Sequence, residues 1–95
     1  MKVSTPEILL VSISYVGLRV TLEVGGSSKP AYVVGTREVT EDKQYLQFNF
    51  ERKENRWYST LEEAGDVFTK LTNGQAIPEE LKGKTLGEME EVVLA

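Results

Sequence analysis

The chain contains neither histidine nor cysteine, and their absence removes most of the side chains used in catalysis and metal binding. Without them the sequence excludes a Ser-His-Asp triad, a Cys-His pair and any zinc or iron site built on imidazole or thiolate ligands. Carboxylate, lysine, tyrosine and serine chemistry remains. We therefore expect a protein that is not an enzyme and that uses no cofactor and no metal.

Three carboxylates, Glu62, Glu63 and Asp66, form the densest acidic group that could still bind magnesium. They fall near the start of a predicted helix, where acidic side chains complement the helix dipole. Two carboxylates alone rarely hold Mg²⁺ without substrate phosphates, so we favour this structural role. Segment 25–29 lacks the spacing of a phosphate-binding loop and precedes Pro30, which predicts a flexible hairpin loop instead.

Cationic and aromatic side chains gather between residues 52 and 58, a combination typical of binding surfaces. The candidate contact residues are Arg52, Arg56, Trp57 and Tyr58, with Tyr45 as a neighbour on an exposed sheet face. Rings that stack on bases beside cations bind single-stranded nucleic acid, and the same residue types form hot spots in protein interfaces. The alternative, which we favour for a lone tryptophan, is that Trp57 fills the core.

The charge of the chain is divided unevenly along its length. Residues 1–60 hold eight basic and seven acidic side chains, whereas residues 61–95 hold three lysines and eight acidic side chains. An acidic C-terminal third argues against binding to duplex DNA or a membrane, which requires clustered cations. We expect either a solvated acidic face or a contact through Glu88, Glu90 and Glu91 with a basic protein partner.

The elements that must position these residues begin with a series of predicted strands. Residues 18–24 alternate between apolar and polar side chains, as in a strand with one buried face. Residues 11–15 alternate in the same way, which predicts a hairpin with its turn at Val16 and Gly17. A further strand is expected at 31–39, before a predicted turn at 40–43, and two more at 44–50 and 56–58 after it. The prediction is four to five strands over residues 8–58.

Apolar residues then recur at helical spacing. Thr60 and Glu63 predict a capping box at the start of a main helix over residues 60–73. Thr85 and Glu88 predict a second box that opens a short C-terminal helix, although the aliphatic ending also permits a strand. These elements predict an α+β fold in which both helical segments cover one face of a small antiparallel sheet. The expected core residues are Leu18, Val20, Leu22, Val24, Leu46, Phe48, Phe50, Leu61, Phe68 and Leu71.

Length and composition complete these expectations. We interpret residues 1–95 as a single domain, because a chain of this size buries one core. The chain has no run of about 20 apolar residues, as a membrane helix requires, and no cysteine, so we expect a cytoplasmic protein. An open edge of an antiparallel sheet can also pair across a two-fold axis, which leaves a homodimer as an alternative to a monomer.

The function we expect is non-catalytic binding to a protein, as an adaptor, accessory subunit or inhibitor. Small, acidic, cysteine-free domains of this kind resemble many phage-encoded inhibitors, anti-CRISPR proteins among them, although that class has no common motif. The alternative function is a single-stranded nucleic-acid-binding module that uses the exposed face of the sheet.

Overall fold

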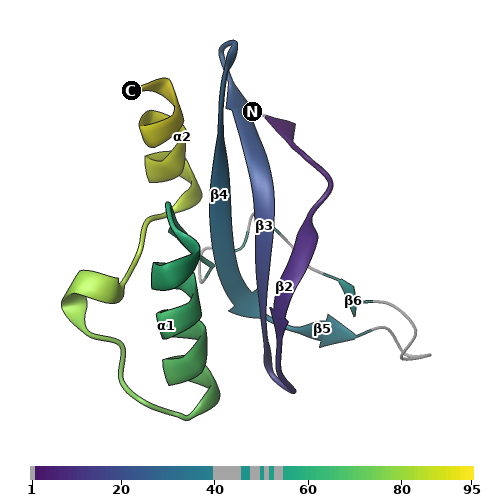
Figure 1. Cartoon of the computed structure of the whole chain (residues 1–95), viewed down its shortest axis with the longest axis vertical. Coiled ribbons are helices and arrows are strands. Elements are labelled where there is room, and N and C mark those ends of the chain that lie inside the picture. The colour runs from purple at the N-terminus through teal and green to yellow at the C-terminus, as the bar shows by residue number, and fades with distance from the viewer. Residues whose placement is uncertain (1, 40–45, 48–49, 51, 53–54) are drawn as a thin grey trace.

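The computed structural model describes residues 2–39, 46–47, 50, 52 and 55–95, and two long antiparallel strands form its centre (Figure 1). These are β3 (Tyr15–Val24) and β4 (Ser27–Thr36), which pair along their whole length. One edge of β3 pairs with β1 (Lys2–Val3) and β2 (Glu7–Val11), and the far edge of β4 pairs with β7 (Arg56–Tyr58). The result is a five-stranded antiparallel sheet. A separate two-stranded pair is formed by β5 (Glu38–Val39) and β6 (Leu46–Gln47).

Two α-helices follow the sheet and confirm the predicted α+β class. They are α1 (Leu61–Thr72) and α2 (Leu86–Leu94), with a short 3₁₀ turn, η1 (Glu79–Leu81), between them. The Thr60 side chain accepts a hydrogen bond from the Glu63 N–H, and Thr85 with Glu88 forms the reciprocal capping box. The C-terminal segment is therefore a helix and not a strand.

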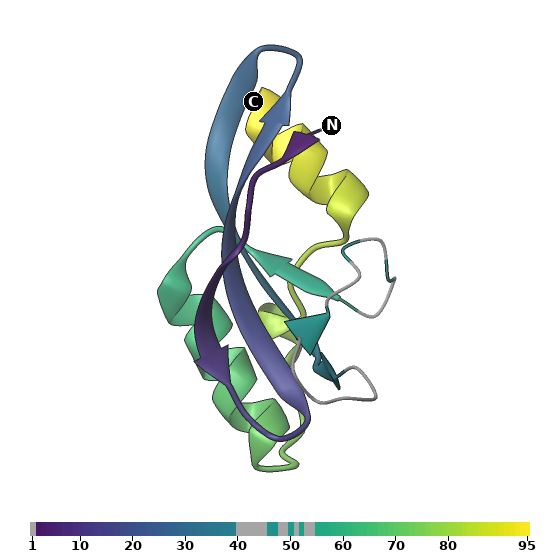
Figure 2. The ribbon, with the colours of Figure 1, turned by 90° about the vertical axis from the view of Figure 1, so that its right-hand side faces the viewer.

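The two helices pack on opposite faces of the sheet, which corrects the prediction that both cover the same face. Successive residues of a strand point to opposite faces. Ala31 and Val33 of β4 pack in one cluster with Met89 and Val93 of α2. Their neighbour Val34, together with residues of α1, belongs to a second cluster. Figure 2 shows α1 and α2 on either side of the β3–β4 ribbon. Residues 31–34 of β4 decide this arrangement, because they place buried or partly buried side chains on both faces of the strand.

The hairpin that begins the sheet is confirmed, but its turn lies earlier than predicted. Residues 12–14 form the turn, where the Ser12 Oγ accepts from the Tyr15 N–H at 3.0 Å. Gly17 is instead a buried strand residue opposite Leu10. A Cβ at Gly17 would lie 3.2 Å from the Leu10 side chain, so the close approach of β2 requires a small residue there.

The loop predicted at residues 25–29 is a two-residue turn. Gly25 and Gly26 have φ angles of 53° and 84°, as the tight turns that match the twist of a hairpin require. β4 therefore begins at Ser27, and Pro30 lies within the strand opposite Thr21. Gly35, near the end of β4, pairs regularly with Val16.

The predicted core is confirmed for most of β3 and differs on α1. Val24 of β3 and the predicted core residue Phe50 are partly buried against the core. Leu18, Val20 and Leu22 are all buried, as expected. Leu61, the first residue of α1, is 46% exposed and therefore not part of the core. Ala64 and Val67 are the helix residues that the structure buries, with the predicted core residues Phe68 and Leu71 partly buried beside them. The predicted turn at 40–43 and the predicted core residue Phe48 lie outside the described residues.

Candidate functional site

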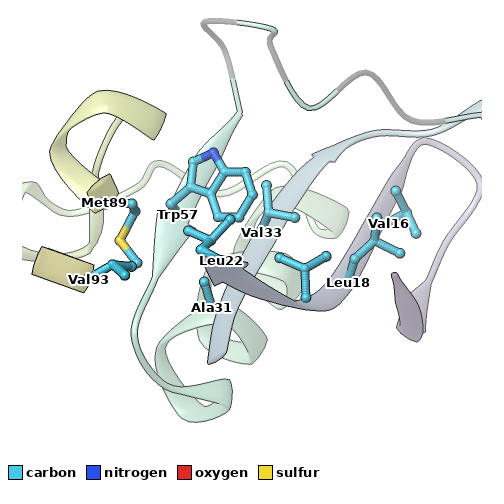
Figure 3. Packing of buried hydrophobic residues seen from close by; sticks show 9 residues of the cluster. Val16, Leu18, Leu22, Ala31, Val33, Trp57, Met89 and Val93 are labelled. Atoms are coloured by element: carbon cyan, nitrogen blue, oxygen red, sulfur yellow. The ribbon is translucent and has the colours of Figure 1, made fainter. Parts of the chain in front are cut away.

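The aromatic pair predicted as a contact surface lies inside the protein, which corrects that prediction. Trp57 and Tyr58 are 1% and 2% exposed. Because they are successive residues of β7, they point to opposite faces, Trp57 into the cluster under α2 and Tyr58 into the cluster under α1. Figure 3 shows Trp57 among Leu22 and Val33. Neither ring is available to stack on a base, so the core alternative for Trp57 is the correct one.

The cations of the same segment are on the surface. Arg52 and Arg56 are exposed, whereas Tyr45 lies outside the described residues. Arg56 shares its face of β7 with Tyr58, because the two are separated by one residue. The structure therefore separates the predicted group into two exposed cations and two buried rings, which weakens the nucleic-acid alternative.

The acidic residues predicted on the C-terminal helix lie on the outward side of α2. Glu88 and Glu91 are exposed and Glu90 is partly buried, while Met89 and Val93 face the core. The Glu88 carboxylate accepts from the Thr85 N–H at 3.1 Å, and this bond lowers the pKa of Glu88. Glu88 therefore stabilises the start of its own helix. Glu90 and Glu91 keep their carboxylates outside this cap.

An apolar edge that sequence reasoning did not identify is the most exposed hydrophobic feature of the described residues. Within them β2 pairs with β3 alone, so the outer edge of β2 is open. Ile8 and Val11 of β2 are 52% and 51% exposed, and Ile13 in the turn that follows is 93% exposed. We call these three residues, with the open strand edge, the β2 edge.

A bulge in β2 places Ile8 and Val11 on the same face of the sheet, whereas Ile13, in the turn, lies beside Leu71 and Gly74 at the C-terminal end of α1. Ile8 is opposite Leu18 and Val11 is opposite Val16, with an irregularity in register between Ile8 and Leu10. Two residues that are three positions apart in a regular strand point to opposite faces. The extra residue of a bulge between them brings both side chains to the same face. The turn beyond is held in place by Arg37, whose guanidinium donates to the Ser12 carbonyl at 3.0 Å. The sequence signal for this edge was the apolar run 8–11, but its exposure depends on the bulge.

A cavity of about 440 Å³ lies between α1 and the sheet face that α1 covers. Its lining residues come from β3, β4, β7, α1 and the segment after α1. They are Tyr15, Val34, Gly35, Thr36, Arg56, Tyr58, Val67, Leu71, Ile77 and Lys82. Its lining is apolar apart from Thr36, two cations and the tyrosine hydroxyls.

No protein-family model, no curated protein and no solved structure matches this chain. Among the described residues, no group of three or more acidic side chains is arranged to hold a metal ion. No helix in that part of the chain has the length and apolar character needed to cross a membrane. The candidate sites are therefore the β2 edge, the outward side of α2 and the cavity beside α1.

Tyr58 gives a prediction for stability at high pH. Burial raises the pKa of its phenol from 10.0 to about 12, while the charges of Arg56 and Glu63 have smaller, opposite effects. The folded protein thus retains a proton that the unfolded chain loses, so the stabilisation is complete below pH 10 and disappears as the pH rises toward 12. We expect Tyr58→Phe to flatten this decline in the free energy of unfolding, measured in urea at several pH values. Tyr32→Phe is the control, and an equal decline in both variants would contradict the assignment.

Proposed function

We propose that this protein is a non-catalytic binding protein that acts through contact with another protein, as an adaptor, accessory subunit or inhibitor. The observation that supports this role is the β2 edge. An open strand offers unpaired backbone donors and acceptors, and natural sheets usually protect such edges with charges, prolines or covering segments. β2 itself has a bulge and one charged residue, Glu7, yet three aliphatic side chains beside it remain exposed. A partner strand could add to the sheet while its side chains cover Ile8 and Val11, with Ile13 in the turn at the end of the edge.

The outward side of α2 favours a partner with basic groups. Glu90 and Glu91 lie there with Glu88, and no lysine or arginine belongs to the helix. Complementary charge across an interface mainly raises the rate of association and makes binding sensitive to salt. Because Glu88 also caps α2, variants that test this contribution should change Glu90 and Glu91 and leave Glu88 intact.

The test is a single charge placed on the β2 edge. We expect Ile13→Asp to weaken binding of the native partner at least about tenfold. An aliphatic side chain that the partner would bury becomes a charge that must be desolvated when the complex forms. Folding should be unaffected, since Ile13 is 93% exposed and aspartate is common in turns. The measurement is affinity capture from nuclease-treated lysate of the cells that produce the protein, with quantitative mass spectrometry.

The matched control is Leu61→Asp, which places the same charge on an exposed leucine at the start of α1, away from the β2 edge. A partner that is lost with Ile13→Asp and retained with Leu61→Asp supports the proposal. Analytical ultracentrifugation of the purified protein identifies the case in which the partner is a second copy. A monomer whose captured proteins are the same for both variants would contradict the proposal.

A further inference from the structure

The cavity beside α1 differs in charge from the rest of this acidic protein. Two cations, Arg56 and Lys82, are among its lining residues, and no aspartate or glutamate is. The chain as a whole has a net charge of −4. We propose that this cavity binds a small molecule with an apolar body and one carboxylate group, at a site distinct from the β2 edge.

The apolar part of the cavity suits a hydrocarbon body. Val34 and Val67 are 2% and 1% exposed and form its floor between β4 and α1. Leu71 and Ile77 are partly buried and line its sides. Small-molecule sites of about 300–1,000 Å³ are typically lined by such side chains, with few polar groups to fix orientation, and the volume of about 440 Å³ falls in this range.

The cationic part of the cavity suits a carboxylate. Arg56 is exposed and makes no ion pair with another described residue. Lys82 pairs with Glu79 at 2.6 Å, but both side chains are more than half exposed. Exposed pairs of this kind contribute little stability, so Lys82 can exchange Glu79 for a ligand carboxylate at small cost. A guanidinium can in addition bind both oxygens of a carboxylate.

Tyr58 keeps the wall between these two parts neutral. Its hydroxyl donates to the Leu81 carbonyl at 2.9 Å, which fixes the ring against the segment after α1. A phenol has an ordinary pKa of 10.0, which burial raises further here, so Tyr58 adds no negative charge near the cations at neutral pH. The same hydrogen bond holds the segment that carries Lys82 beside the sheet, because Leu81 precedes Lys82 directly.

The first experiment titrates the ¹⁵N-labelled protein with decanoate below its micelle concentration and follows amide chemical shifts. We expect saturable shifts centred on Val34, Val67, Leu71 and Ile77. Decanol is the matched probe, since it has the same chain without the charge, and we expect it to bind about fivefold or more weakly. Absence of saturable shifts, or equal affinity for decanol, would overturn the proposal.

The second experiment identifies the cations responsible. Arg56→Gln should weaken decanoate binding about fivefold and leave decanol binding unchanged. Lys84→Gln is the control, because Lys84 is an exposed cation close to Lys82 in the sequence but does not line the cavity. Both variants have the same net charge, so a general electrostatic effect would lower the affinity for decanoate equally in both. Equal loss in the two variants, or no loss with Arg56→Gln, would count against the proposed site.

Discussion

Trp57→Ala is expected to lower the free energy of unfolding by about 3–5 kcal/mol, the usual range for removing a buried aromatic side chain. Trp57 is 1% exposed, and its cluster joins the sheet to α2 through Met89 and Val93. Its ring also packs against Phe50, with ring centroids 6.2 Å apart. Because small domains have a total stability of about 5–15 kcal/mol, this loss can leave the variant largely unfolded at room temperature.

The control for this prediction is Trp57→Phe. The indole N–H of Trp57 is buried without a hydrogen-bond partner in the described part of the chain. An unpaired buried donor costs about 1–3 kcal/mol, so phenylalanine loses packing volume but also removes that penalty. We expect a much smaller loss for phenylalanine than for alanine. Urea unfolding followed by far-UV circular dichroism measures both variants, and an alanine variant within about 1 kcal/mol of the native protein would show that the cluster does not depend on Trp57.

Gly83→Ala is the second large effect that we expect. Gly83 has a φ of 73°, where a residue with a side chain is less stable by about 1–2 kcal/mol. A Cβ there would also lie 2.8 Å from two ring carbons of Tyr58 and 3.0 Å from the Trp57 carbonyl oxygen. Tyr58 cannot easily move away, because it is buried and bonded to Leu81. Overpacking adds about 1–3 kcal/mol, which gives a total loss of about 2–5 kcal/mol.

Gly74→Ala separates the two causes. Gly74 has a similar φ of 67°, but a Cβ there would have no atom within 4 Å. Only the conformational penalty applies, and we expect a loss of about 1–2 kcal/mol. Urea midpoints for the two variants provide the comparison. Equal losses would mean that the contact with Tyr58 relaxes without penalty.

Local patterns in the sequence were sufficient to predict most elements of the fold. The alternation of residues 18–24 identified the buried face of β3, and Thr60 and Thr85 identified the starts of both helices. The turn at residues 12–14 could not be found in this way. Glycine is a common turn residue, so the local pattern favours a turn at Gly17. In the structure, however, Gly17 is a strand residue, where the close approach of Leu10 leaves no room for a larger side chain. Contacts between strands are not visible in the local sequence.

The candidate sites were harder to predict than the fold, because exposure depends on three-dimensional packing. Composition made Trp57 and Tyr58 candidate binding residues, although the core was the favoured place for Trp57, and both are core residues of β7. Ile8 and Val11 have the composition of core residues, yet the bulge in β2 and the position of that strand at the sheet edge leave them half exposed. The cavity combines residues from five separate segments, so no single motif could indicate it.

The placement of the helices on opposite faces has a consequence for how the chain folds. β3 and β4 are joined by a two-residue turn, so this hairpin closes with a small loss of entropy and can form early. Each helix then completes a separate hydrophobic cluster on a scaffold that is already present. The hairpin is therefore the expected folding nucleus. Destabilising changes in α1 or α2 should mainly accelerate unfolding, whereas changes within the hairpin should slow folding.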